Sequence, residues 1–150
     1  MKASRKSEAL ADENITVLLI EDSMEDGVAI TKALIEGETF YSFKIIRKYT
    51  LEGGMDFLKA TAVDAVLLDL GLPDARDLKS VMEIHKRYPH VPIVVVSGYS
   101  DMNVIHRALE SGAQEFLIKG EMSGPVIRQS MYQAIARKKI ELAYQKGERL

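Results

Sequence analysis

Polar side chains that could do chemistry follow four apolar segments of this sequence. Glu21 and Asp22 come after ITVLLI, Asp69 ends AVLLD, Ser97 follows PIVVV and Lys119 follows EFLI. If the apolar segments are parallel strands, their carboxyl ends meet at one edge of a sheet. We therefore expect carboxylates, a hydroxyl and an amine to gather there as a metal and phosphoryl site.

The residue types limit the chemistry of such a site. Glu21, Asp22 and Asp69 offer only oxygen ligands, which suits Mg²⁺ or Mn²⁺. Lys119 and Ser97 can hold phosphate oxygens through a positive charge and a hydroxyl donor. Nothing in this set resembles a base that would activate water, so Asp69 itself is the expected nucleophile. Its attack on phosphorus would give an aspartyl phosphate.

Isolated polar residues at such junctions have simpler explanations. Asp22 or Ser23 could do no more than cap a helix, Ser97 could be a turn residue, and Lys119 a solvated strand end. Asp69 is different, because a carboxylate at the end of a strand as apolar as AVLLD is costly unless it is paired or bound to a metal. The functional interpretation therefore starts from Asp69.

Size and composition fit one soluble globular domain. A chain of 150 residues with 47% hydrophobic and 28% charged residues can bury roughly two-thirds of its unfolded surface. The absence of cysteine excludes disulfides, thiolate metal sites and a Cys nucleophile. The net charge of -2 gives no sign of direct nucleic-acid binding. No apolar run is long enough to span a membrane and no signal peptide is visible, so we expect a cytoplasmic protein without membrane contact.

Five segments rich in Val, Ile and Leu alternate with stretches of helical periodicity. The predicted strands are 15–20, 43–48, 64–69, 92–97 and 115–119. Three of them are almost continuously apolar, which is typical of parallel strands buried on both faces. The second is mixed and is expected at an edge. This alternation predicts an α/β fold with a doubly wound parallel sheet and right-handed crossovers.

Capping residues and apolar stripes indicate a helix after each strand. The first helix should bury Val28, Leu34 and Ile35, and Thr50 should cap the second. Inside that second helix, Gly53 and Gly54 each disfavour the helix by about 1 kcal/mol relative to Ala. The remaining signals are Leu78, Val81, Met82 and Ile84 in the third helix; a Ser100 or Asp101 cap, Leu109 and a C-terminal Gly112 in the fourth; and Ser123, Pro125, Ile127, Met131, Ala134 and Ile135 in the fifth.

Four motifs carry a resemblance to a known family. In order, VLLIEDSMED, AVLLDLGLPDARDL, IVVVSGYSD and GAQEFLIKG resemble the receiver domain of two-component response regulators, over about residues 15–136. The resemblance implies a flavodoxin-like five-stranded parallel sheet with strand order 2-1-3-4-5 and five helices. It also implies a phosphorylation-dependent switch. The phosphoryl donor would be a sensor histidine kinase or a histidine phosphotransfer protein.

The resemblance assigns a role to each site residue. Asp69 is the implied phosphoacceptor, and Ser97 and Lys119 would contact the phosphoryl group. Phe116 matches the family's switch aromatic, which turns inward when the hydroxyl residue moves toward the phosphate. The surface around strand 4, helix 4, strand 5 and helix 5 would then change for a downstream output protein or domain. The implied magnesium ligands are Glu21, Asp22, Asp69 and the backbone carbonyl of Gly71.

Loss of the phosphoryl group is expected to be slow. Gly71 offers no polar group to orient a hydrolytic water, and Tyr99 is large enough to cover its approach. Tyr99 could instead contact partners or be merely exposed. A domain that gains and loses its own phosphoryl group is not a turnover enzyme on external substrates.

Asp77 departs from the family pattern and leaves open both its own conformation and the function of the domain. Asp77 stands eight residues after Asp69, where the family usually has Gly in a loop that favours positive φ. Asp77 would either adopt the left-handed conformation or cap the third helix. Asp77 also leaves open an alternative function, a phosphorylation-independent interaction module. A phosphatase of the haloacid dehalogenase type is disfavoured, because it would need a second Asp where Gly71 stands.

The predicted organisation is an N-terminal extension at 1–14, a receiver domain at 15–136 and a basic extension of the last helix at 137–150. This extension carries five Lys or Arg against two Glu. Arg137-Lys138-Lys139 is expected to be a solvated face. Alternatively, the extension is a signalling helix that pairs with a partner, for example in a homodimer through the last helices. No output domain follows, so we expect a stand-alone receiver or one cut from a longer protein.

Overall fold

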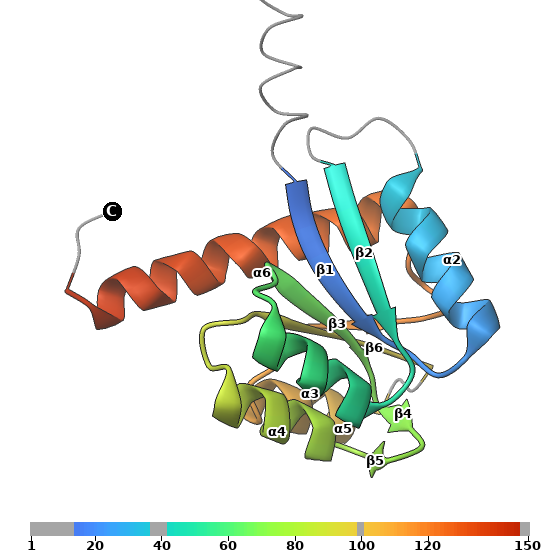
Figure 1. The fold of residues 1–150 in the computed structure, drawn as a ribbon, viewed down its shortest axis with the longest axis horizontal. Helices are drawn as coiled ribbons and strands as arrows, with labels where there is room; N and C mark the ends of the chain where they lie inside the picture. Colours follow the sequence, from blue (N-terminus) through green and yellow to red (C-terminus); the bar gives the residue numbers. More distant parts are fainter. Residues whose placement is uncertain (1–13, 37–41, 99–100, 148–150) are drawn as a thin grey trace, which may run out of the picture.

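Apolar strands and helices alternate along the chain in this computed structural model, which describes residues 14–36, 42–98 and 101–147 (Figure 1). The main sheet contains β1 (Asn14–Ile20), β2 (Ser42–Lys48), β3 (Ala65–Asp69), β6 (Ile93–Ser97) and β7 (Glu115–Ile118). The helices of the described part are α2 (Met24–Ile35), α3 (Leu51–Ala60), α4 (Lys79–Arg87), α5 (Met102–Glu110) and α6 (Gly124–Gln145).

The sheet has the predicted topology. Its five strands are parallel and follow the order β2-β1-β3-β6-β7, which is 2-1-3-4-5 when only the main strands are counted. The mixed strand β2 lies at an edge, as expected. A short antiparallel hairpin of β4 (Gly71–Leu72) and β5 (Ala75–Arg76), which the sequence did not predict, follows β3 directly.

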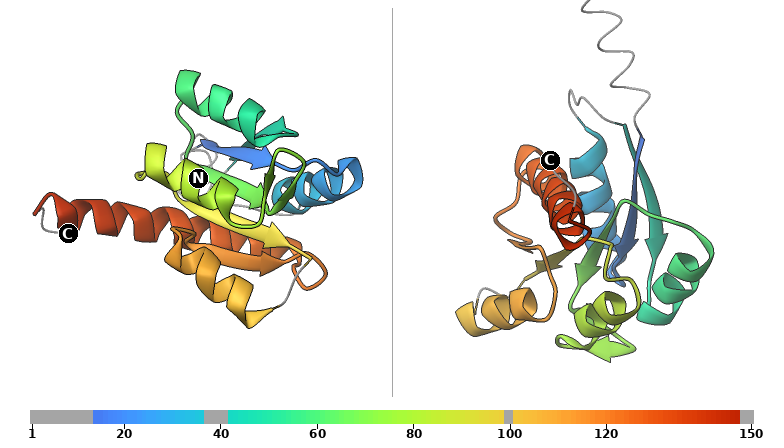
Figure 2. Two further views of the ribbon diagram at one scale, coloured as in Figure 1. Left: turned by 90° about the horizontal axis from the view of Figure 1, so that it is seen from below. Right: turned by 90° about the vertical axis from the view of Figure 1, so that its left-hand side faces the viewer.

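Side chains of the central strands point alternately to the two faces of the sheet, and each face is covered by a layer of helices. In β1, Leu18 and Ile20 enter a buried cluster with α3, α4 and α5, whereas Val17 and Leu19 enter a second cluster with α2 and α6. Successive strand residues point to opposite faces, so one apolar run supplies both cores. The sheet therefore lies between two layers of helices (Figures 1 and 2). None of the described helices has the length and hydropathy that a membrane span requires.

Most predicted caps are present. Ser23, Thr50, Asp101 and Ser123 each accept a backbone N–H of the first turn of their helix, which satisfies a donor that the helix itself leaves unpaired. After α5, Gly112 has φ 123°, as its predicted position past a helix end requires.

The backbone of Asp77 distinguishes between its two predicted roles, a left-handed residue and a helix cap. Its φ is 58°, so the left-handed alternative is confirmed. The alternative role as a helix cap is wrong, because α4 starts after Leu78 and has no side-chain capping bond. The side chain of Asp77 instead lies 3.6 Å from the Arg107 guanidinium of α5, in an exposed ion pair.

Four predicted core positions are wrong. Val28, Ile35, Met82 and Leu109 are 56%, 57%, 57% and 44% exposed. In α2 the buried stripe is Gly27, Ile30 and Leu34. A glycine is not read as a core residue in an apolar pattern, so the sequence placed the stripe one residue off. Each residue of an α-helix is turned by roughly 100°, which is enough to expose Val28 and Ile35.

The basic extension also differs from expectation. Helix α6 continues to Gln145 and runs past the rest of the domain (Figure 1). Lys138 is only 6% exposed and lies 3.2 Å from the Glu141 carboxylate. Arg137 donates to the carboxylate of Glu115 at the start of β7. The prediction of a solvated face for Arg137-Lys138-Lys139 is therefore wrong at Lys138 alone, because Arg137 and Lys139 are exposed.

Candidate functional site

Strand register brings the predicted site residues to one edge of the sheet. Ile20 pairs with Leu68, so Glu21 follows β1 at the level of Asp69 in β3. Asp69 in turn pairs with Val96, the residue before Ser97. Directly after the next strand, β7, the backbone N–H of Lys119 donates to the Ser97 carbonyl at 2.9 Å. The carboxyl ends of four parallel strands thus meet, as their order requires.

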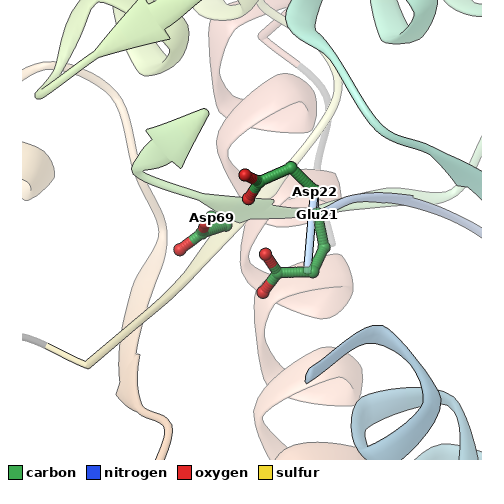
Figure 3. Close-up of side chains that lie close together, drawn as sticks. All are labelled: Glu21, Asp22 and Asp69. Atoms are coloured by element: carbon green, nitrogen blue, oxygen red, sulfur yellow. The ribbon is translucent and has the colours of Figure 1, made fainter. Parts of the chain in front are cut away.

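The three carboxylates predicted to bind a metal lie together. Glu21, Asp22 and Asp69 each offer an oxygen, and these oxygens lie within 4.8 Å of one another. Their carboxylates point to the same side of the strand ends (Figure 3). Glu21 is fully buried and Asp69 is 7% exposed, whereas Asp22 is exposed. The cluster therefore opens to solvent on the side of Asp22.

Lys119 is the cation of this cluster. Its Nζ lies 2.6 Å from Glu21 Oε1, 2.8 Å from Asp26 Oδ2 and 3.3 Å from Asp69 Oδ1. Burial alone would lower the pKa of Lys119, but the hydrogen bonds to Asp26 and Glu21 and the charge of Asp69 raise it above its ordinary value. The side chain therefore stays an ammonium, able to attract an anion.

Glu21 experiences the opposite balance. Burial raises its pKa from 4.5 to about 7, against the effect of Lys119, and the charge of Asp69 contributes to the increase. A buried carboxylate is unfavourable when its charge is incompletely compensated. One ammonium among several carboxylates leaves such a deficit of positive charge.

The donor set fits a hard divalent cation. All ligands that the cluster offers are carboxylate oxygens, which Mg²⁺ and Mn²⁺ prefer, and an ion would supply the positive charge that the buried Glu21 lacks. Gly71, the predicted carbonyl ligand, stands two residues after the end of β3, and a Cβ placed on it would lie 3.4 Å from Asp69 Oδ2. Position 71 therefore faces the same carboxylate.

An open cavity of about 530 Å³ gives access to the site from the side of α5. Its lining includes Asp69, Gly71, Ser97, Asp77 and Arg107. Ser97 is 7% exposed at its edge. The cavity connects the predicted phosphoacceptor and hydroxyl residue with the Asp77–Arg107 ion pair.

Two further predicted residues have different outcomes. Phe116 in β7 is partly buried and packs against the core cluster on the side of α3, α4 and α5. The switch role of Phe116 stays a prediction. Tyr99 lies outside the described residues.

Sequence reasoning missed two residues that the structure places at the site. Asp26, 93 residues from Lys119 in the sequence, binds its ammonium. An acidic residue three positions after a helix cap such as Ser23 is common without any role in a site. Arg47 donates to the backbone carbonyls of Glu21 and Ser23. A signal for Arg47 existed: it shares the face of β2 toward α2 and α6 with the partly buried Phe43 and Ile45.

Comparison with known proteins identifies a matching family and curated relatives. Residues 17–139 match the family model of the response regulator receiver domain. Two-component response regulator ORR1 of Oryza sativa subsp. japonica is 29% identical over 121 residues, which are 75% of this chain and 52% of that protein. Transcriptional regulatory protein CitT of Halalkalibacterium halodurans is 28% identical over 121 residues, 79% of this chain and 50% of that protein. The chain thus spans about half the length of these curated relatives.

Solved structures share the fold. A response regulator receiver domain protein from Clostridium thermocellum has a TM-score of 0.72 at 24% identity, covering 84% of this chain and 98% of that one. A CheY-like receiver domain protein from Methanospirillum hungatei has a TM-score of 0.71 at 19% identity, covering 86% and 99%. At these identities the likeness concerns the flavodoxin-like fold alone.

Proposed function

The chain belongs to the family of response regulator receiver domains, and from this premise we propose that it is a signalling switch phosphorylated on Asp69. The observation that carries the proposal is the meeting of Asp69 with two further carboxylates within 4.8 Å and with an ammonium 3.3 Å away. A functional site is the simplest explanation for so many charged side chains at the end of one apolar strand.

The residues divide the reaction among them. Asp69 attacks phosphorus through a carboxylate oxygen, and the bond between phosphorus and the donor's histidine nitrogen breaks. Lys119 attracts one phosphoryl oxygen and Ser97 donates a hydrogen bond to another. Glu21, Asp22, Asp69 and the carbonyl of Gly71 would hold Mg²⁺ or Mn²⁺. The ion would neutralise charge that builds up on the phosphoryl oxygens.

The phosphoryl donor is proposed to be a sensor histidine kinase or a histidine phosphotransfer protein. An exposed apolar stripe on α2, made of Met24, Val28 and Ile35, supports a protein donor. Met24 follows Asp22 by two residues, so a protein bound to this stripe would stand beside the carboxylate cluster. Large exposed apolar side chains that gather on one helix face favour protein contacts.

The output is proposed to depend on β6, α5, β7 and α6. When Ser97 moves toward a phosphoryl group on Asp69, Phe116 would turn inward and alter this surface for a downstream protein or domain. Phe116 lacks the hydroxyl of the tyrosine more common in the family, so packing alone would drive the change. The α6 extension, which exposes Ile140 and Tyr144, is a candidate surface for a homodimer.

The phosphorylated form is proposed to be long-lived. Gly71 faces Asp69 without a polar group that could orient a water molecule. The proposed shielding by Tyr99 rests on the sequence, as do the cytoplasmic location and the division into 1–14, 15–136 and 137–150. In all these proposals the chain is an acceptor of its own phosphoryl group and not a turnover enzyme.

Phosphorylation of Asp69 can be tested directly. Incubation of the full chain with a small phosphodonor and Mg²⁺ should add one phosphoryl group, detected by intact mass. Asp69→Asn should abolish this addition, because the amide is nearly isosteric but a poor nucleophile. Asp56→Asn, in an exposed position of α3, is the matched control and should be phosphorylated normally. Undiminished labelling of the Asp69 variant, mapped to another residue, would refute the assignment.

No observation favours the phosphorylation-independent alternative. It was based on Asp77 at a position that is usually Gly, but the backbone there adopts the positive φ of 58° without a glycine. The carboxylates and Lys119 nevertheless lie together. The phosphodonor experiment separates the two functions, since an interaction module would remain unlabelled.

A further inference from the structure

Arg47 joins the edge strand β2 to the loop that carries two of the proposed metal ligands. One terminal nitrogen, Nη2, donates to the carbonyl of Glu21 at 3.1 Å and to that of Ser23. The other, Nη1, lies 3.5 Å from the carbonyl of Met24. One guanidinium thus contacts three carbonyls of the segment 21–24, and Asp22 lies between the two that Nη2 binds.

The position of Arg47 follows from the alternation of β2. Phe43 and Ile45 point into the core cluster with α2 and α6, and Arg47, two residues further, points to the same face. Its guanidinium also stacks over the ring of Tyr49 at 4.7 Å. These contacts hold a long flexible side chain in one place, which reduces the freedom of the loop it binds.

Helix α2 has a matching gap for this side chain. Gly27 belongs to the buried stripe of α2, and a Cβ placed on it would lie 2.1 Å from Arg47 Cζ. Real atoms cannot approach so closely, so any side chain at position 27 would displace the guanidinium. Gly27 thus leaves open the space near the start of α2 that the Arg47 guanidinium occupies.

We propose that Arg47, seated under Gly27, is a positioning residue that holds Glu21 and Asp22 in the geometry needed to bind Mg²⁺. The inference rests on the proposed function, because it concerns the same metal site. Arg47 does not touch the ion in this proposal; it acts through the backbone of its ligands. Groups that orient metal ligands commonly change metal affinity when they are removed.

The test is the Mg²⁺ affinity of the full chain, measured by calorimetric titration at a temperature where every variant is folded. Arg47→Met keeps the apolar stem but removes the donors, and it should weaken Mg²⁺ binding roughly tenfold. Arg47→Lys should recover only part of the affinity, because an ammonium cannot reproduce the planar fork. If Arg47→Met does not fold, Arg47→Lys and Gly27→Ala carry the test.

Gly27→Ala tests the same contact from the other side. It should weaken Mg²⁺ binding although it changes no charge and adds a helix-favouring residue. Because both substitutions disrupt one contact, the double variant Gly27→Ala, Arg47→Met should bind Mg²⁺ no more weakly than the weaker single variant. Additive losses would overturn the proposal that the two residues act together.

Lys48→Met is the matched control. It removes the neighbouring cation of β2, whose ammonium lies over the Phe57 ring at 5.6 Å on the opposite face of the sheet, and it should leave Mg²⁺ affinity unchanged. Folded Arg47→Met with wild-type affinity would overturn the inference alone. A wild-type chain without saturable Mg²⁺ binding would contradict the proposed function, and the inference with it.

Discussion

Asp77 occupies a backbone conformation that L-residues seldom adopt. At φ 58° a side chain crowds the neighbouring carbonyl, and Asp tolerates this better than most residues because it can hydrogen-bond locally. The ion pair with Arg107 is exposed, and such pairs contribute little. The backbone, rather than the ion pair, should therefore decide the effect of a substitution at this position.

Two substitutions of Asp77 separate these contributions. Asp77→Gly and Asp77→Ala both remove the ion pair, but only Gly relieves the steric conflict. The Gly variant should therefore have the higher free energy of unfolding, by about 1 kcal/mol, and should equal or slightly exceed the wild type. Urea unfolding measures the difference. An Ala variant more stable than the Gly variant would mean that residue 77 is not left-handed in solution.

Asp74 is a structural carboxylate outside the proposed site. Its two oxygens accept the backbone N–H groups of Leu51 and Glu52 at 2.8 and 2.9 Å, at the start of α3. Slight burial would raise the pKa of Asp74, but these hydrogen bonds and the nearby Lys79 hold it below its ordinary value of 3.8. A carboxylate at a helix N-terminus favours the helix when it is ionised.

The sign of the pH dependence follows from that lowered pKa. The folded state binds the proton of Asp74 less readily than the unfolded state, so its stabilisation is present above about pH 4 and is lost as the pH falls through the folded pKa. Asp74→Ala should lower the free energy of unfolding by about 1 kcal/mol at pH 7, and this difference should shrink near pH 3. Asp56→Ala is the control and should have little effect at either pH.

At the scale of elements, α3 depends on one of its two glycines. A Cβ on Gly54 would lie 2.4 Å from Ile20 Cδ1, inside the buried core, whereas a Cβ on Gly53 would lie 3.2 Å from Thr50 Oγ1 at the helix start. Both glycines lower the intrinsic helix propensity of α3. At position 54, the absence of a side chain lets α3 pack closely on β1, and this packing compensates for the lower propensity. This contact explains why α3 forms despite the two glycines.

Replacing each glycine of α3 by Ala should give opposite outcomes. Ala has the higher helix propensity by about 1 kcal/mol at both positions. At position 54 the clash with Ile20 should outweigh this gain, and Gly54→Ala should lower the free energy of unfolding by about 1–2 kcal/mol net. Gly53→Ala should be neutral or stabilising. Thermal unfolding measures both, and a stabilised Gly54 variant would show that the core yields easily.

At the scale of the whole molecule, the carboxylate cluster links metal binding to folding. The cluster forms only when the ends of β1 and β3 lie side by side, so an ion bound there binds the folded state alone. Mg²⁺ at a hundred times its dissociation constant should then raise the free energy of unfolding by about 2.7 kcal/mol.

Asp22→Ala should abolish this stabilisation by Mg²⁺, because it removes the exposed ligand of the cluster. The measurement is urea unfolding with and without Mg²⁺ at constant ionic strength, with Asp56→Ala as a control that should respond like the wild type. Equal stabilisation of the Asp22 variant would place the ion elsewhere. Excess chelator should return the wild type to its metal-free stability and also prevent phosphorylation.

Local patterns in the sequence determined much of this molecule. Strand positions, the edge placement of β2, the helix caps and the gathering of Glu21, Asp22, Asp69, Ser97 and Lys119 all follow from the order of apolar segments and from the residues at their ends. A buried parallel strand needs apolar residues on both faces, and a helix start needs an acceptor. Neighbouring residues carry both signals, so they can be recognised in a sequence.

Tertiary structure alone decided the rest. The contact between Lys119 and Asp26 joins residues that are 93 positions apart in the sequence. The contacts of Arg47 with Glu21 and Ser23 join residues that are 26 and 24 positions apart. These contacts depend on the conformations that loops and side chains adopt after the strands have paired. No apolar pattern marks Gly27 as buried, yet the Arg47 guanidinium occupies the space beside it. Lys138, predicted to be solvated, is buried and pairs with Glu141. Side-chain reach and excluded volume are three-dimensional properties, which no one-dimensional pattern contains.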